Sequence, residues 1–342
     1  MFAPSGKPRL FGIAPGIDFP KELVAGLRAR LADQPPHAMA QATVIVNTRR
    51  MARRLRDIFD AGPTSFLPRI LTLTDLEALE PAITLPAAIS PLRRRLDLVQ
   101  LVSRLLETDQ TIAPRASLYA LSDSLASLID EMQGEGVAAE TIANLDVSDQ
   151  SGHWERAKRF LDIAQDYLAH KSDAPAAEAR QRQLVLRSAQ RWETDPIRTP
   201  VIVAGSTGSR GTTSLLMDAV ARLPQGALVL PGFDFEGPLH MWDMLAGTPP
   251  REDHPQYRFY ALMQSLNVNR SDIRPWAGAV PPSPDRNALI SLSLRPAPVT
   301  DTWLSEGPTL KNLSNATNGL TLVEAPTPRL EALVIALRLR KA

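Results

Sequence analysis

The sequence predicts an α/β fold in which a parallel sheet is assembled from two stretches of chain separated by an all-helical insertion. Short, continuously apolar runs, typical of strands buried on both faces of a parallel sheet, occur before residue 85 and again after residue 198. Helical patterns alternate with these runs, which favours parallel strands. The residues between the two stretches carry apolar positions at helical spacing only.

The first stretch, residues 1–88, contains three predicted strands with helical patterns between them. The strands are Leu10–Ile13, Thr43–Val46 and Arg69–Leu73. The helices are Pro20–Leu31 and Arg49–Phe59. This order of elements predicts the first half of the α/β domain.

Residues 89–197 form the predicted helical insertion. Ser90 and Pro91 make a good N-cap and first helical residue. The apolar stripe that follows consists of Leu92, Leu96, Val99, Leu101, Val102, Leu105 and Leu106. Three further helices are predicted over Leu118–Met132 (ended by Gly134 and Gly136), Trp154–Leu168 and Ala176–Trp192.

Residues 198–312 are predicted to complete the α/β domain with proline-rich loops. The predicted elements are strands at Val201–Ala204 and Gly226–Asp234 and helices at Thr212–Leu223, His240–Leu245 and Tyr257–Leu266. Residues 313–342 contain a predicted strand, Gly319–Glu324, and a predicted helix, Arg329–Arg340. That helix has no capping or stop signal, so we expect it to open a following, truncated domain of a longer protein.

The amino-acid composition excludes several classes of function. The chain has 342 residues, 44% apolar and 22% charged, with a net charge of +1, so no overall field favours nucleic acid or a membrane. It has no cysteine, which excludes disulfides, thiolate zinc sites and iron–sulfur clusters within this chain and fits a cytoplasmic location. No apolar run approaches the ~20 residues of a membrane span, and the N-terminus lacks a signal-peptide core.

The first strand leads into a turn that looks like a phosphate-binding loop without its chemistry. Gly12, Pro15 and Gly16 supply the tight turn between strand and helix. A functional loop of this kind ends in a lysine and a hydroxyl residue, which hold phosphate and magnesium. Here Asp18 and Phe19 stand in their place, and Asp18 puts negative charge where phosphate would sit. The loop therefore predicts no ATP hydrolysis.

A second glycine-rich turn resembles a dinucleotide-binding fingerprint. Gly205, Gly208 and Gly211 follow a strand and open a helix, and Asp234 ends the next strand. One interpretation is an NAD(P)-binding oxidoreductase that uses these residues. The other, which we favour, is a purely structural turn, because it comes late in the chain and the only Tyr-x-x-x-Lys, starting at Tyr167, precedes it. Arg210 beside this turn is a candidate anion contact.

Other candidate chemistry is weak. Asp130 and Glu131 mimic the acidic pair that holds magnesium in nucleotide hydrolases, but helical spacing predicts that they face solvent. The five histidines are scattered, so metal binding is not expected. No G-x-S-x-G motif of the common serine hydrolases occurs.

Arginines are densest in one predicted helix. They are Arg49, Arg50, Arg53, Arg54 and Arg56, and a second group is Arg93, Arg94 and Arg95. Phosphate contact is one interpretation. The alternative is a solvated helix face balanced by Asp57 and Asp60.

The arrangement of these segments resembles the N-terminal third of the AddB family, the helicase–nuclease partner subunits of double-strand break repair, in its alphaproteobacterial form. The resemblance covers essentially the whole chain and is most specific in PVIVAGSTGSRGTTSLLMDAVARLPQGALVLPGFD and HPQYRFYALMQSLNVNRSDIRPW. It implies a RecA-like, superfamily 1 helicase-like domain whose motor is inactivated. In that family the chain packs on an AddA-type helicase–nuclease subunit and guides DNA.

The resemblance also implies roles for individual residues. The loop from Gly12 to Phe19 would occupy the Walker A position. Ala204, Gly205 and Ser206 would occupy the Walker B position, where the metal-binding acids are missing. VIVNTRR would border the DNA, and we expect no cofactor in this portion. The family's nuclease domain would lie further along a much longer chain.

The segment after the second strand is the best candidate for contact with DNA. Open α/β sheets bind ligands at the carboxyl ends of their strands, where the helix beginning at Arg49 would start. Thr48 is placed to cap that helix. Its free N–H groups, with Arg49 and Arg50, would then face a phosphate.

Overall fold

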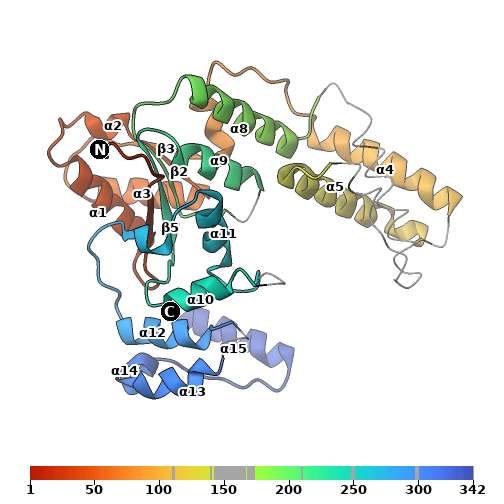
Figure 1. Cartoon of the computed structure of the whole chain (residues 1–342). Coiled ribbons are helices and arrows are strands. Elements are labelled where there is room, and N and C mark those ends of the chain that lie inside the picture. Colours follow the sequence, from red (N-terminus) through yellow and green to blue (C-terminus); the bar gives the residue numbers. More distant parts are fainter. Residues whose placement is uncertain are drawn as a thin grey trace.

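A six-stranded parallel sheet forms the centre of the molecule (Figure 1). The computed structural model describes residues 1–109, 112–138, 141, 167, 174–208, 211–247, 251–296 and 300–341. The strands are β1 (Leu10–Ile13), β2 (Thr43–Val46), β3 (Arg69–Thr72), β4 (Val201–Ala204), β5 (Gly226–Pro231) and β6 (Arg274–Pro275). Their order across the sheet is β3-β2-β4-β5-β1-β6, and every pairing is parallel. The prediction that the strands beginning near residues 10, 43, 201 and 228 share one sheet is therefore confirmed.

One face of the sheet is covered by helices from the N-terminal part of the chain. They are α1 (Phe19–Leu31), α2 (Ala38–Gln41) and α3 (Arg49–Asp60). Leu27 of α1 and Leu55 of α3 pack in one core with Val44 and Val46 of β2. Side chains alternate along a strand, so the residue between these two valines, Ile45, belongs to the core on the opposite face.

The opposite face is covered by helices that come later in the chain. They are α8 (Ala177–Thr194), α9 (Gly211–Ala221), α10 (Leu239–Met244) and α11 (Tyr257–Ser265). Val185, Leu216 and Phe259 from three of them lie in one core with Val203 and Leu228 of the sheet. The fold is thus a three-layer α/β/α arrangement with a core on each side of the sheet.

Helices α4 (Pro91–Thr108) and α5 (Leu118–Glu135) form an antiparallel pair that extends away from the sheet (Figure 1, right). Ser90 caps α4 by accepting a hydrogen bond from the Arg93 backbone, as predicted. The predicted apolar stripe was partly wrong. Leu92 and Leu96 are 67% and 53% exposed, while the buried positions are Arg94, Leu98, Val102 and Leu106. The predicted helix at 154–168 lies outside the described residues, apart from position 167.

The C-terminal part carries four helices below the sheet (Figure 1, blue). They are α12 (Pro284–Ser293), α13 (Thr302–Glu306), α14 (Leu313–Thr317) and α15 (Pro328–Lys341), of which the last confirms a prediction. The predicted strand at Gly319–Glu324 is wrong. This segment is exposed and irregular, with Leu322 at 85% exposure. A strand needs a neighbour to satisfy its backbone groups, and no described strand lies beside this segment.

Short 3-10 turns complete the elements. They are η1 (Leu73–Ala78), η2 (Arg115–Ser117), η3 (Arg270–Asp272) and η5 (Gly307–Thr309). The strand predicted to reach Leu73 ends one residue earlier. Its last residue, Thr72, forms a capping box with Asp75, and this starts η1. Within the described ranges, no helix combines the length and apolarity needed to cross a membrane.

Candidate functional site

The carboxyl edge of the sheet contains a point where the connections from neighbouring strands diverge. The chain leaves β2 toward α3 on one face, and it leaves the adjacent β4 toward α9 on the other face. Ligands of open α/β sheets bind at such switch points. The predicted segments do meet here, because a Cβ atom added at Gly205 would lie 3.3 Å from the Phe19 ring and 3.8 Å from the Met51 methyl group.

The degenerate loop after β1 has an acidic residue built into its helix terminus. Asp18 is the N-cap of α1 and accepts a hydrogen bond from the Lys21 backbone at 3.3 Å. Its carboxylate also lies 3.4 Å from the Lys21 ammonium group and 3.8 Å from the Arg54 guanidinium group. The place where a helix N-terminus would receive phosphate is thus filled by the protein's own carboxylate.

Other side chains close over the same loop. Asn287 of α12 donates a hydrogen bond to the Pro15 carbonyl at 3.0 Å. Gly16 has a left-handed φ of 83°, and Pro282 lies 3.5 Å from the point where its Cβ would be. At Gly12 an added Cβ would lie 2.7 Å from Phe233. The segment between β5 and α10 packs so closely against β1 that only glycine fits at position 12. This packing explains the glycine, and no bound ligand is needed to explain it.

The turn after β4 lacks acidic side chains, and its described polar groups bond to β5 or within the turn. Ala204 is fully buried, and Gly205 takes a left-handed φ of 78° while its N–H donates to the Val229 carbonyl. Ser206 accepts a hydrogen bond from the Gly208 backbone at 3.2 Å. These residues offer no carboxylate that could hold a magnesium ion.

The groups that a dinucleotide would need already have partners within the protein. The backbone N–H of Gly211, at the start of α9, donates to the Glu135 carboxylate at 2.8 Å. Asp234 accepts hydrogen bonds from the Glu236 and Gly237 backbones at 2.8 and 2.9 Å and from the Ser291 hydroxyl at 2.6 Å. The acid that the oxidoreductase interpretation assigned to a ribose thus already accepts three hydrogen bonds within the protein. The candidate anion contact Arg210 and the lysine of the Tyr-x-x-x-Lys pattern, Lys171, lie outside the described residues.

These contacts give the first prediction. We expect neither MgATP nor NADH, each at millimolar concentration, to raise the unfolding temperature of the chain, because both glycine-rich turns are closed by internal carboxylates. ATP turnover should likewise be absent. The measurements are a thermal-shift titration and a steady-state phosphate-release assay. Turnover that disappears in Gly16→Asp would show that the β1–α1 loop is active.

The arginines of α3 divide into two groups. Thr48 caps the helix as predicted, accepting a hydrogen bond from the Met51 backbone at 3.1 Å, and Arg49 and Arg50 beside it are exposed. Arg54 pairs with Asp18 of the neighbouring loop. The guanidinium group of Arg56 donates to the Ile70 carbonyl at 3.2 Å, and Arg53 is exposed. All five arginines are exposed, but Arg54 and Arg56 are bonded to other segments, which leaves Arg49 and Arg50 at the N-terminal turn of α3 and Arg53 one turn later.

An acidic residue from the neighbouring strand also lies at this edge. The pKa of Asp75, after β3, is lowered mainly by hydrogen bonds from the Thr72 hydroxyl and backbone, and further by the charges of Arg49 and Arg56. Asp75 is thus an acidic neighbour of Arg49 and Arg56. Sequence patterns had not indicated Asp75 as a member of this edge.

The second arginine group has a structural role. Arg94 is buried, and it donates to the Asp130 carboxylate at 2.6 Å and to the Ala126 carbonyl at 3.1 Å. Arg95 makes two hydrogen bonds of 2.8 Å to Asp123. The prediction that Asp130 simply faces solvent was wrong, because it holds α4 against α5.

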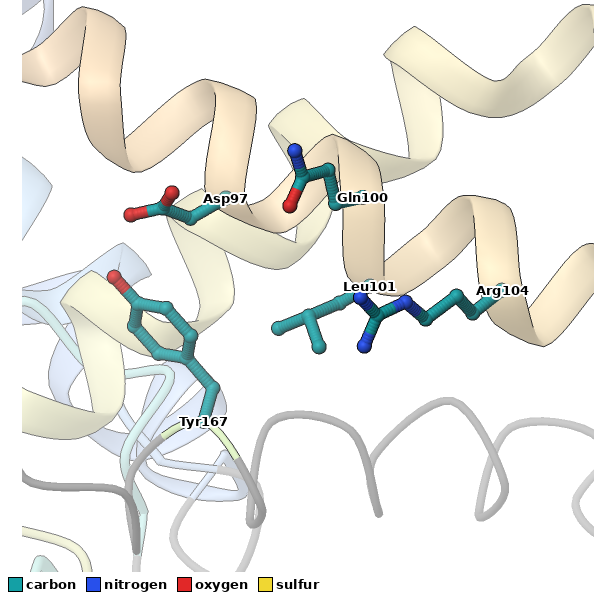
Figure 2. A pocket seen from close by; sticks show the side chains of 5 residues that line it. All are labelled: Asp97, Gln100, Leu101, Arg104 and Tyr167. Carbon is teal, nitrogen blue, oxygen red and sulfur yellow. The ribbon is translucent and has the colours of Figure 1, made fainter.

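A separate pocket of about 240 Å³ lies beside α4 (Figure 2). It is lined by Asp97, Gln100, Leu101, Arg104 and Tyr167. Figure 2 shows Asp97 and the Tyr167 hydroxyl at one end and Arg104 at the other. This pocket was not predicted, and Tyr167, the first residue of the Tyr-x-x-x-Lys pattern, is the one motif residue in its described lining. Across the described part of the chain, no group of three or more His, Asp or Glu side chains is placed to hold a metal ion.

The sequence was also compared with known proteins. No model of a known protein family matches it, and no curated protein matches it either.

Proposed function

We propose that this chain is a non-catalytic, helicase-like scaffold portion of an AddB-type subunit that acts in double-strand break repair and DNA end processing. It would bind an AddA-type helicase–nuclease subunit and guide DNA along the carboxyl edge of its sheet. One observation carries the proposal. Two turns that lack the residues for nucleotide hydrolysis lie at the same edge of the sheet as a helix N-terminus with exposed arginines. Asp18 replaces the phosphate-binding lysine region in one turn, and Ala204–Ser206 lacks metal-binding acids in the other.

The strand order supports a scaffold of this kind over an NAD(P)-dependent oxidoreductase. In the dinucleotide-binding fold the first strand lies beside the second, in the order 3-2-1-4-5-6. Here β4 and β5 separate β1 from β2. The glycine-rich turn after β4 also has its helix terminus occupied by Glu135.

The N-terminal turn of α3 favours contact with a phosphate backbone. Free N–H groups and the helix dipole at this end attract anions, and two exposed guanidinium groups add charge. Such contacts bind nucleic acid without reading its sequence. The net charge of the chain is only +1, so a local patch, not the whole molecule, would provide the attraction.

Exposed apolar side chains support the partner-binding part of the proposal. Large exposed apolar patches commonly mark interaction surfaces. Most of the large exposed apolar residues lie in the C-terminal part of the chain, among them Trp303, Leu304, Leu322, Leu337 and Leu339. Helix α15 has no buried residue at all.

The second prediction tests the DNA path. Arg49→Ala combined with Arg50→Ala should weaken binding of the assembled complex to single-stranded DNA. The slope of log affinity against log salt should flatten by about 0.7 for each lost phosphate contact. The measurement is a salt titration of DNA affinity for wild type and variant.

Arg54→Ala combined with Arg56→Ala provides a matched control. It removes the same charge from the same helix, but these side chains already bond Asp18 and the Ile70 carbonyl. We expect its salt slope to stay at the wild-type value. Equal slopes for all three proteins would assign Arg49 and Arg50 to a solvated face and place the DNA elsewhere.

A further inference from the structure

The α4–α5 pair has its own hydrophobic core, separate from the two cores that flank the sheet. The buried members of this core are Leu98, Val102, Leu106, Leu125, Ile129 and Met132. Arg94 and Arg95 of α4 add ion pairs to Asp130 and Asp123 of α5. The pair is therefore held together internally as one arm, which we define as residues 91–135.

The end of α5 joins this arm to helices α8 and α9 through hydrogen bonds. The Gly211 N–H donates to the Glu135 carboxylate at 2.8 Å. The Gly134 carbonyl accepts from the Thr212 hydroxyl at 3.0 Å and from the Arg182 guanidinium group at 3.0 Å. One turn of α5 thus binds both α8 and α9.

The backbone geometry of the junction is closely fitted. An added Cβ at Gly211 would lie 2.7 Å from a Glu135 carboxylate oxygen, 2.9 Å from its Cα and 3.0 Å from the Gly134 carbonyl oxygen. Gly136 has a left-handed φ of 75°, which ends α5 and is readily adopted only by glycine. Two glycines of this turn, Gly134 and Gly136, flank the residue that makes the charged contact.

The junction is polar and partly open to water. Glu135 is exposed, and its carboxylate sits at the N-terminus of α9, where the helix dipole favours a negative charge. Water can replace such hydrogen bonds when they break, whereas an apolar core cannot separate without exposing its surface. The hydrogen bonds of this turn to α9 and α8 can therefore break without opening the core of the arm or the two cores that flank the sheet.

We propose that Gly134–Gly136 is a hinge and that Glu135 is the latch which fixes the arm against the N-terminus of α9. Opening the latch would let the arm pivot as a unit. Since α9 begins directly after the turn that carries Gly205, the position of the arm is linked to the carboxyl edge of the sheet. This device does not depend on which ligand binds at that edge.

The test uses the fact that the chain contains no cysteine, so two introduced cysteines can be spin-labelled selectively. Thr108→Cys places one label on the arm and Asp60→Cys places the other at the end of α3. Electron–electron double resonance should give a narrow distance distribution for the otherwise unchanged chain. We expect Glu135→Ala to widen that distribution at least twofold.

Two further variants make the result decisive. Thr212→Val, which removes the hydroxyl donor on the α9 side with little change in volume, should widen the distribution as well. Asp123→Ala, which removes an α5 carboxylate bonded only within the arm, should leave it narrow. Circular dichroism checks that each variant is folded. The proposal would be overturned if the distance distribution of Glu135→Ala were as narrow as that of the otherwise unchanged chain. It would also be overturned if the distribution of the otherwise unchanged chain were already broad.

Discussion

Trp276→Ala is expected to lower the free energy of unfolding by about 3–5 kcal/mol, the range for removing a large aromatic side chain from a core. The indole is 1% exposed and packs edge-on against Phe11 with ring centres 5.1 Å apart. Its N–H donates to the Leu23 carbonyl at 3.0 Å, and the Arg30 guanidinium group lies 3.8 Å from its ring centre. The substitution therefore removes the contact between α1, β1 and β6 and leaves a cavity.

Chemical denaturation, followed by circular dichroism, measures this loss. Trp303→Ala is the matched control, because that indole is 48% exposed, and we expect it to cost about 1 kcal/mol or less. If the two variants lost the same stability, Trp276 would not anchor the edge of the sheet in solution.

Gly226→Ala is expected to destabilise the fold by about 3 kcal/mol, at the upper end of the usual cost of overpacking. An added Cβ would overlap the Val220 carbonyl oxygen and lie 2.9 Å from its carbon and 3.0 Å from the Leu223 Cβ. The clash involves backbone, which cannot rotate away as a side chain can. Gly226 opens β5, which pairs with β4 and β1 in the middle of the sheet, so the strain would spread to both neighbours.

Gly278→Ala serves as its control, since nothing lies within 4 Å of the added Cβ and the backbone is not left-handed. We expect its unfolding midpoint to match that of the wild type within error. A Gly226→Ala variant as stable as this control would mean that the turn before β5 is looser than the structure describes.

The interior strands could be predicted because burial on both faces makes them continuously apolar. Thr43–Val46 and Val201–Ala204 were predicted at their observed bounds. The edge strand Arg274–Pro275 was missed because it is two exposed residues long and has no apolar pattern. The segment at 319–324 has strand-like composition, but pairing depends on a neighbour distant in sequence, which composition does not specify.

The candidate site could be predicted only where its residues act locally. The Thr48 cap could be predicted because Thr48 directly precedes a helical pattern. The absence of the phosphate-binding lysine from the first turn could be read directly from the sequence. The pairing of Asp18 with Arg54, and of Glu135 with Gly211, joins segments that sequence spacing does not relate. Arg94 shows the same limit, because its burial depends on Asp130 of another helix.

The position of β1 between β5 and β6 has a consequence for the time at which the protein can fold during synthesis. β2 can pair with β3 after a short connection, but β1 has no partner until β5 has been made. At about 5–20 residues per second, the roughly 200 residues between β1 and β5 take about 10–40 s to translate. During that interval the first strand of the nascent chain keeps its apolar side chains and backbone groups unpaired, which makes it a natural target for chaperones that bind extended apolar segments.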